Sequence, residues 1–205
     1  VEDNVRFVQD YYSERYADLE ADLICCRHVL EHIEHPRDFL KGIIRTTGEK
    51  WEGILFFEVP NVMYTLRDLG VWDLIYEHVG YFSASSLRHL FEGAGCGVKR
   101  LTEEYEGQFL CIDASGGVGS DDLPEIRVDS KEEVLGLCRD FSEKFHSKIQ
   151  LFQKEIDRIR TSGQRAVVWG AGSKGISFLN NLKVREEIQF VVDINPKKQG
   201  EFVPG

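Results

Sequence analysis

Apolar and polar positions follow two different periods along the chain, and each period predicts a different element. Asp22–Cys26 and Gly53–Val59 are short, almost continuous apolar runs, which are typical of strands buried on both faces of a parallel sheet. Between them, an apolar face with helical spacing begins after Pro36, a residue that fits the first turn of a helix. The order strand, helix, strand predicts a parallel β-α-β unit.

Further elements are predicted on both sides of this unit. Val5–Val8 alternates enough to form a short strand before it. Ser83–Ala94 predicts a helix capped by Ser83 or Ser85, and the glycines around its end turn the chain into two closing strands at Val98–Leu101 and Phe109–Ala114. The stretch Ser115–Asp122, rich in Gly, Ser and Asp, predicts a surface loop and a domain boundary.

Beyond that loop, the apolar residues follow the period of an α-helix over about 30 positions. Apolar residues recur at three-and-four spacing through Lys131–Arg160, which predicts one long amphipathic helix. The elements expected after it are a strand from Arg165 to Trp169, a tight turn at Gly170–Gly175, a helix at Ile176–Leu182 and a strand at Ile188–Asp193. The fold class is therefore α/β, with an incomplete Rossmann-like sheet, a long connecting helix and a second Rossmann-like β-α-β unit. The expected domains are 1–122, 123–162 and 163–205.

Composition excludes some classes of binding partner and some cellular locations. The 205 residues carry a formal net charge of −10, which argues against nucleic acid or an anionic membrane as the main partner. No apolar run approaches the length needed to span a bilayer. The five cysteines are scattered without CxxC spacing, so we interpret them as reduced thiols and expect a cytoplasmic protein without a metal site.

The segment 27–36 is the first candidate site, because it directly follows the buried strand at 22–26. In open α/β sheets, ligands bind at the carboxyl ends of the strands. Within the segment, His28, Glu31 and His32 also match H-x-x-E-H, an inverted zinc-peptidase motif. That motif needs a continuous helix, whereas here it follows a strand and is crowded by Pro36. We therefore disfavour the zinc interpretation.

Three ordered segments resemble one known family. Asp22–Leu40, which contains Leu30-Glu31-His32, resembles the fourth-strand region of class I S-adenosylmethionine (SAM)-dependent methyltransferases. Phe57–Asn61 resembles the next strand of that fold, and Ile75–Ser83 resembles a stretch typical of the branch that includes sugar C-methyltransferases. The resemblance covers roughly residues 5–114, and three ordered matches are more specific than one.

The resemblance implies a cofactor and the residues near it. SAM is the expected cofactor, with Asp10 and Tyr11 near its adenine and Arg27 and His28 beside its methionine end. Val5–Val8 most resembles the third strand of the fold. We therefore expect that these 205 residues lack the first two strands of the fold, together with the glycine-rich turn and the acidic residue that follow them. For this reason we expect the 205 residues alone to be inactive.

The resemblance also implies a catalytic group. His78 is expected to remove a proton from the acceptor, with Glu77 orienting it and with Tyr76 and His32 close by. The acceptor is expected to be a small polar molecule such as a nucleotide-linked sugar. Sugar C-methyltransferases have Tyr-x-Glu-His here, whereas this chain has Ile75 at the tyrosine position, which leaves an O- or N-methyl acceptor open. The structural alternative is that Glu77 and His78 simply pair with each other.

A second nucleotide site is predicted from a glycine pattern. Gly170, Gly172 and Gly175 form G-x-G-x-x-G between a predicted strand and helix, which is a dinucleotide-binding fingerprint. Asp193, at the end of the next strand, would hold a ribose, and Lys174 would contact a phosphate. Glycines also serve packing alone, so a purely structural turn remains open. The alternative function that follows is a non-catalytic nucleotide-binding or regulatory module.

Overall fold

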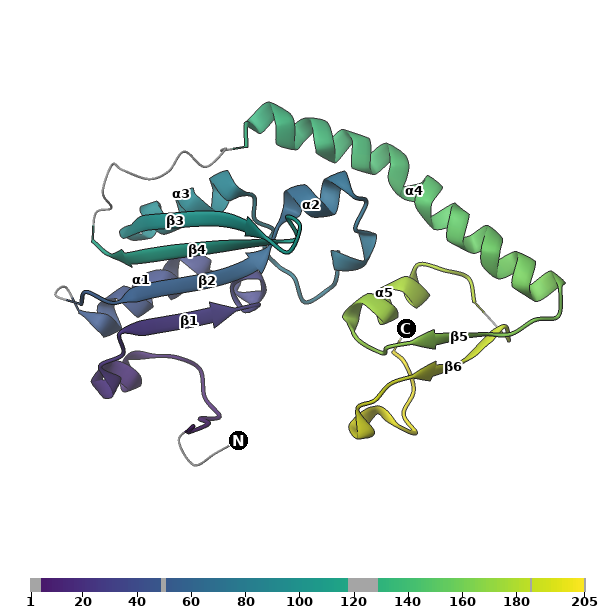
Figure 1. Cartoon of the computed structure of the whole chain (residues 1–205), viewed down its shortest axis with the longest axis horizontal. Coiled ribbons are helices and arrows are strands. Elements are labelled where there is room, and N and C mark those ends of the chain that lie inside the picture. The colour runs from purple at the N-terminus through teal and green to yellow at the C-terminus, as the bar shows by residue number, and fades with distance from the viewer. Residues whose placement is uncertain (1–4, 49–50, 118–128, 185, 205) are drawn as a thin grey trace. The chain divides into compact units, whose positions relative to one another are not determined.

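The computed structural model describes residues 5–48, 51–117, 129–184 and 186–204 of the chain (Figure 1). The chain divides into two compact units. The first contains Val1–Pro60 and Phe82–Val128, and the second contains Asn61–Tyr81 and Asp129–Gly205. The mixed α/β class expected from the sequence is confirmed, whereas the three-part domain organisation stays a prediction.

The first unit is built on a four-stranded mixed sheet with the strand order β1-β2-β4-β3. Its strands are β1 (Leu23–Arg27), β2 (Ile54–Pro60), β3 (Cys96–Glu104) and β4 (Phe109–Gly116). β1 and β2 run parallel, and β4 is antiparallel to both β2 and β3. The carboxyl ends of β1 and β2 therefore lie at one edge of the sheet. The start of β4 reaches the same edge, because Phe109 pairs with Pro60.

Helices α1 (Pro36–Thr47) and α3 (Ala84–Ala94) pack against this sheet (Figure 1). Both begin where local signals predict, and α3 also ends where they predict. Pro36 occupies the first turn of α1, and Ser83 caps α3 in a capping box with Ser86. Gly95 ends α3 with φ at 96°, a left-handed conformation that glycine adopts without strain.

The core of the first unit lies between the two helices and the sheet. It combines side chains from α1 and α3 with the inward-facing residues of the central strands β2 and β4. Its fully buried members are Leu30, Leu40, Leu55, Phe57, Val59, Leu87, Phe91, Leu110, Ile112 and Ala114. Burial of these apolar side chains holds the strand ends, and with them the candidate site, in place.

Two sequence predictions are wrong in this unit. Val5–Val8 is exposed and forms no strand in the described structure, since no neighbouring strand there satisfies its backbone groups. The strand predicted at 22–26 is present as β1, but its residues alternate between exposed and half-buried instead of being buried on both faces. β1 is the edge strand of the described sheet, so one of its sides lacks a covering neighbour.

The second unit contains a short helix pair, a long helix and a β-α-β passage. Its elements are α2 (Val62–Arg67), the 3₁₀ turn η3 (Val71–Asp73), α4 (Lys131–Thr161), β5 (Ala166–Trp169), α5 (Ser173–Asn180), β6 (Ile188–Val192) and the 3₁₀ turn η4 (Pro196–Lys198). β5 and β6 form a parallel pair, as predicted. α5 begins three residues earlier than predicted, within the glycine turn.

α4 is a single amphipathic helix, which confirms the prediction from its period. One part of its apolar face packs on α2 and η3 through Phe141, which is buried with Leu66 and Val71. Further along, Phe152 meets Trp72 edge to face, with ring centroids 5.4 Å apart. Within the described ranges, no helix is both long and apolar enough to cross a membrane.

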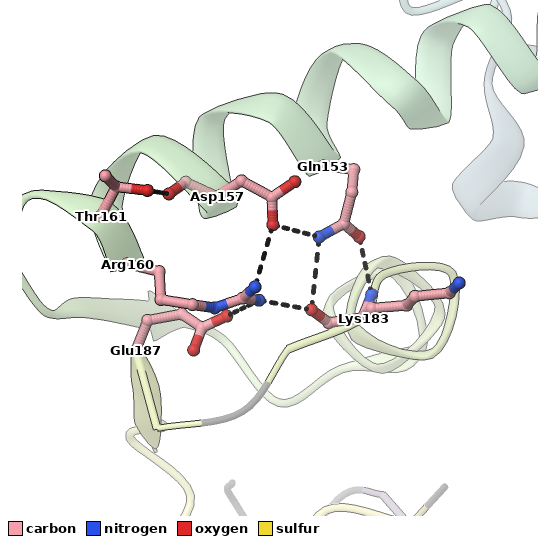
Figure 2. A network of polar contacts seen from close by, with 6 residues as sticks. All are labelled: Gln153, Asp157, Arg160, Thr161, Lys183 and Glu187. Carbon is pink, nitrogen blue, oxygen red and sulfur yellow. Dashed lines mark hydrogen bonds and ion pairs between the residues drawn. The ribbon is translucent and has the colours of Figure 1, made fainter.

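Polar contacts attach the last turns of α4 to the segment between α5 and β6 (Figure 2). Gln153 accepts a hydrogen bond from the Lys183 N–H at 2.8 Å and donates to the Lys183 carbonyl at 3.3 Å. Arg160 donates to the same carbonyl at 3.2 Å and pairs with the buried Glu187 carboxylate at 2.7 Å. These contacts fix α4 to the β-α-β passage within the second unit.

The buried thiol of Cys96 should make the stability of the first unit depend on pH in the alkaline range. Its side chain is 3% exposed, and burial raises the pKa of this thiol from 9.0 to about 11. The Cys96 thiol therefore ionises at a lower pH in the unfolded chain than in the folded protein. Its contribution to stability is complete below pH 9 and is lost as the pH rises from 9 to about 11. We expect the free energy of unfolding to fall by about 1.4 kcal/mol per pH unit from this residue in that window.

Urea unfolding at pH 8, 9, 10 and 11 measures this slope. The Cys96→Ala variant should show a shallower slope than the wild type, whereas Cys138→Ala, which removes an exposed thiol on α4, should leave the slope unchanged. Equal slopes for the wild type and Cys96→Ala would contradict the prediction.

Candidate functional site

A cluster of ionisable side chains lies at the carboxyl ends of β1 and β2. Arg27 and Glu58 are directly paired in the register of the two strands. The Glu58 side chain is 4% exposed, and its Oε1 accepts hydrogen bonds from Nε and Nη2 of Arg27 at 3.1 and 3.0 Å. The same oxygen lies 2.9 Å from Nε2 of His28. One buried carboxylate oxygen thus holds two cationic or cation-forming side chains at the carboxyl ends of the strands, which is where ligands bind in open sheets.

His28 is held in an uncommon conformation directly after β1. Its φ of 53° is in the left-handed region, which costs free energy for a residue with a Cβ. Its backbone N–H donates to the Glu58 carbonyl at 3.0 Å, and its ring meets Phe109 edge to face with centroids 4.8 Å apart. The strand end, the carboxylate and the aromatic ring therefore fix both the backbone and the imidazole of His28.

Glu31 brings a second buried carboxylate to this cluster. It lies in the 3₁₀ turn η2 (Leu30–His32), is 1% exposed, and places Oε1 3.5 Å from Nδ1 of His28. Its Oε2 is buried and has no hydrogen-bond partner among the described residues. The H-x-x-E-H residues are not on one continuous helix, since His28 precedes a single 3₁₀ turn. The geometry that the zinc-peptidase motif requires is therefore absent from this segment.

Glu58 is the residue that sequence reasoning missed. The available signal was a single carboxylate within an otherwise apolar strand, Ile54–Pro60, because a buried charge is retained only where it has partners. Its Oε2 faces Sγ of Cys111 on β4 at 3.7 Å. Burial, followed by the nearby Glu58 charge, raises the pKa of the Cys111 thiol to about 11, so this neighbour stays neutral at physiological pH.

Asp10 and Tyr11, expected near the adenine, lie in an extended segment of the first unit. Tyr11 is 88% exposed. Asp10 accepts from the Tyr11 N–H at 2.8 Å and from the Tyr16 hydroxyl at 2.6 Å, and it pairs with Arg15 at 2.9 Å. The Tyr16 hydrogen bond is the main reason that the pKa of Asp10 is lowered. The described contacts of Asp10 are thus local, and the structure does not join it to the Arg27–Glu58 cluster.

The predicted catalytic residues lie in different units. His32 is exposed at the end of η2 in the first unit, whereas Tyr76, Glu77 and His78 form a turn in the second. Tyr76 is 98% exposed. The half-buried His78 ring lies edge to face with Tyr81, with centroids 6.2 Å apart, and the His78 N–H donates to the Ile75 carbonyl. Burial, assisted by Asp73, raises the pKa of Tyr81.

The glycine turn of the second unit has the shape that its pattern predicts. Gly170 has a φ of 101°, and a Cβ on Gly175 would collide with the Gly170 carbonyl oxygen, so both positions require glycine. The Asp193 carboxylate accepts hydrogen bonds from the N–H groups of Ala171 at 2.8 Å and Asn195 at 2.9 Å. These bonds, with that from Asn195 the larger cause, lower the pKa of Asp193. The Asp193 carboxylate therefore stabilises the glycine turn by binding the backbone N–H of Ala171.

The remaining residues predicted for this turn also have protein partners. Lys174 forms an ion pair with Asp73 at 2.9 Å, and Gly172 is the N-cap of α5. Beside the turn is a cavity of about 660 Å³, whose lining includes Ala171, Asp193 and Lys198. Ligand binding by Gly170, Gly172, Lys174, Gly175 and Asp193 stays a prediction.

Known protein families match both the first and the last part of the chain. Residues 2–101 match a family described as a methyltransferase domain, and residues 127–205 match one described as a C-methyltransferase C-terminal domain. The chain is similar to the C-methyltransferase NovU of Streptomyces niveus, with 24% identity over 194 residues. This alignment covers 90% of the chain and 46% of NovU, so the chain spans about half the length of this relative.

These matches favour the methyltransferase interpretation over a non-catalytic nucleotide-binding module. Members of the matched methyltransferase family use SAM as methyl donor. The two matched domains occur in one chain, and the relative aligns across both of them. The chain therefore belongs to the SAM-dependent C-methyltransferase-like family.

Proposed function

We propose that the full-length protein transfers a methyl group from SAM to a carbon atom of a small polar acceptor, of the nucleotide-linked sugar class. The observation that carries the proposal is the pair of matched domains, because the second is described specifically as the C-terminal domain of C-methyltransferases. The description of NovU as a C-methyltransferase supports transfer to carbon rather than to oxygen or nitrogen.

The cluster at the ends of β1 and β2 fits the methionine end of SAM. This end of the cofactor carries an ammonium group, a positively charged sulfur and a carboxylate. Nearby carboxylates stabilise the first two groups, and a guanidinium or imidazole can bind the third. Glu31 has a buried carboxylate oxygen without a hydrogen-bond partner in the described structure, which leaves it able to accept a bond from a ligand. Arg27 and His28 would line the same end, and Asp10 and Tyr11 would lie on the adenine side.

The residues of this chain would align the acceptor and move its proton. When bound, SAM supplies an electrophilic methyl group. His78 would remove the proton from the acceptor carbon next to a keto group, which leaves that carbon nucleophilic. Glu77 would orient the imidazole of His78, and Tyr76 and His32 would contact the polar groups of the acceptor. Holding both reactants in line supplies much of the rate enhancement in such a transfer.

Methyl transfer is tested with the full-length protein, SAM carrying a ¹³C-methyl group, and a set of nucleotide-linked keto sugars deuterated next to the carbonyl. We expect one acceptor to gain the ¹³C-methyl on carbon and to lose deuterium at the same position, with one S-adenosylhomocysteine formed per methyl transferred. A protein that binds NAD in a manner dependent on Asp193 but does not bind SAM would contradict the proposal and support the nucleotide-binding alternative.

A further inference from the structure

We propose that Glu58 is a positioning residue of the methyltransferase site, which holds Arg27 and His28 in the one arrangement that receives the methionine end of the cofactor. This inference rests on the proposed function and adds to it a residue that neither the sequence motifs nor the family resemblance singled out.

The first argument is the asymmetry of burial within the cluster. The Glu58 side chain is 4% exposed, whereas those of Arg27 and His28 are 53% and 41% exposed. Glu58 is thus the fixed end of both contacts, and the two cationic or cation-forming groups extend from it toward the surface of the sheet edge. Contacts arranged in this way restrict the orientation of groups that remain accessible to a ligand.

The second argument is the free-energy cost of the carboxylate. The rest of β2 is apolar, and its neighbours Phe57 and Val59 are fully buried. Removing a carboxylate from water costs free energy, and ion pairs with partners that stay half exposed to solvent return little of it, so stability alone does not account for a charged group at this place. A role in arranging ligand-binding side chains does account for it.

The third argument is that Glu58 holds His28 at two points. The Glu58 carbonyl accepts the His28 backbone N–H at 3.0 Å, and the carboxylate lies 2.9 Å from the ring Nε2. These two contacts support a left-handed backbone at His28 that would otherwise be unfavourable. With Nε2 beside the Glu58 carboxylate, the ring directs Nδ1 toward Glu31, whose Oε1 is 3.5 Å away. Glu58 therefore fixes the orientation of the His28 ring between two buried carboxylates.

The experiment compares the wild-type full-length protein with Glu58→Gln and Glu58→Ala. Asp113→Asn is the matched control, because Asp113 accepts a 2.7 Å bond from Arg100 on the neighbouring strand pair and is not part of the cluster. Affinity for SAM is measured by calorimetry, the ring nitrogens of His28 by ¹⁵N NMR, and folding by thermal unfolding. Glutamine keeps the shape and one acceptor oxygen but loses the charge.

We expect Glu58→Gln to weaken SAM binding about tenfold, the lower end of the loss seen when a residue that orients metal-binding side chains is replaced in metal sites. The His28 ring signals should change in this variant, because a neutral amide replaces the carboxylate beside Nε2. Glu58→Ala should weaken binding further, and Asp113→Asn should match the wild type in both measurements.

A folded Glu58→Gln variant that binds SAM as tightly as the wild type would overturn this inference, whatever its ring signals. If Glu58→Ala does not fold, the glutamine variant alone decides. If the wild-type protein itself binds no SAM, the proposed function fails instead, which separates the two failures.

Discussion

Replacement of His78 by alanine is expected to reduce methyl transfer by the full-length protein about 10²- to 10⁴-fold, the range that loss of a general base produces. The proton next to the acceptor's keto group must leave for its carbon to attack the methyl group, and alanine has no group that accepts it. Affinity for SAM should stay within a few-fold of the wild type, because we assign the cofactor to the residues around Glu58 and not to the turn at 76–78.

Two neighbouring substitutions serve as controls for His78. Glu77→Gln should have a smaller effect on turnover than His78→Ala, since it removes the orienting charge but leaves the base. Tyr81→Phe keeps the ring that packs against His78 and should leave SAM affinity unchanged. Steady-state rates with a ¹³C- or tritium-labelled methyl donor provide the measurement. Unchanged turnover in His78→Ala would remove His78 from the mechanism.

Replacement of Phe57 by alanine is expected to lower the free energy of unfolding of the first unit by about 3–5 kcal/mol. Phe57 is fully buried on β2, and its ring meets those of Phe91 on α3 and Phe39 on α1 edge to face, with centroid distances of 5.2 and 6.5 Å. Alanine would leave a cavity at the place where both helices meet the sheet.

Phe7→Ala is the matched control for Phe57, because it removes the same side chain from the same unit at a position that is 82% exposed. It should change the stability by less than about 0.5 kcal/mol. Urea unfolding followed by the ¹⁹F signal of fluorotryptophan at Trp51 reports on the first unit, since Trp51 packs against its core. Equal stability losses in the two variants would contradict this view of the core.

Much of the secondary structure could be predicted from local signals, since these act within a few residues. Ser83 and Gly95 bound α3 because a hydroxyl satisfies free N–H groups at a helix start and glycine permits the left-handed turn at its end. The three-and-four spacing of apolar residues in 131–160 specifies α4 for a similar reason. The Gly170 turn followed from glycines that have no Cβ to collide with the backbone.

The candidate site was only partly predictable. Arg27 and His28 could be singled out because they follow a recognisable strand, but their shared partner Glu58 is 31 positions away along the chain from Arg27. Only the parallel register of β1 and β2 places Glu58 opposite Arg27. The ion pair between Lys174 and Asp73 likewise depends on a contact between distant segments.

By itself the sequence determined the α/β class, the positions of most helices and strands, and the family, since these depend on periodicity, caps and ordered motifs. The tertiary structure decided that Val5–Val8 forms no strand and that β1 is the edge strand of the sheet formed by the described residues. It also decided that a buried carboxylate organises the end of the sheet. The physical reason is that burial and the pairing of charges are properties of neighbours in space, which the order of residues along one segment does not specify.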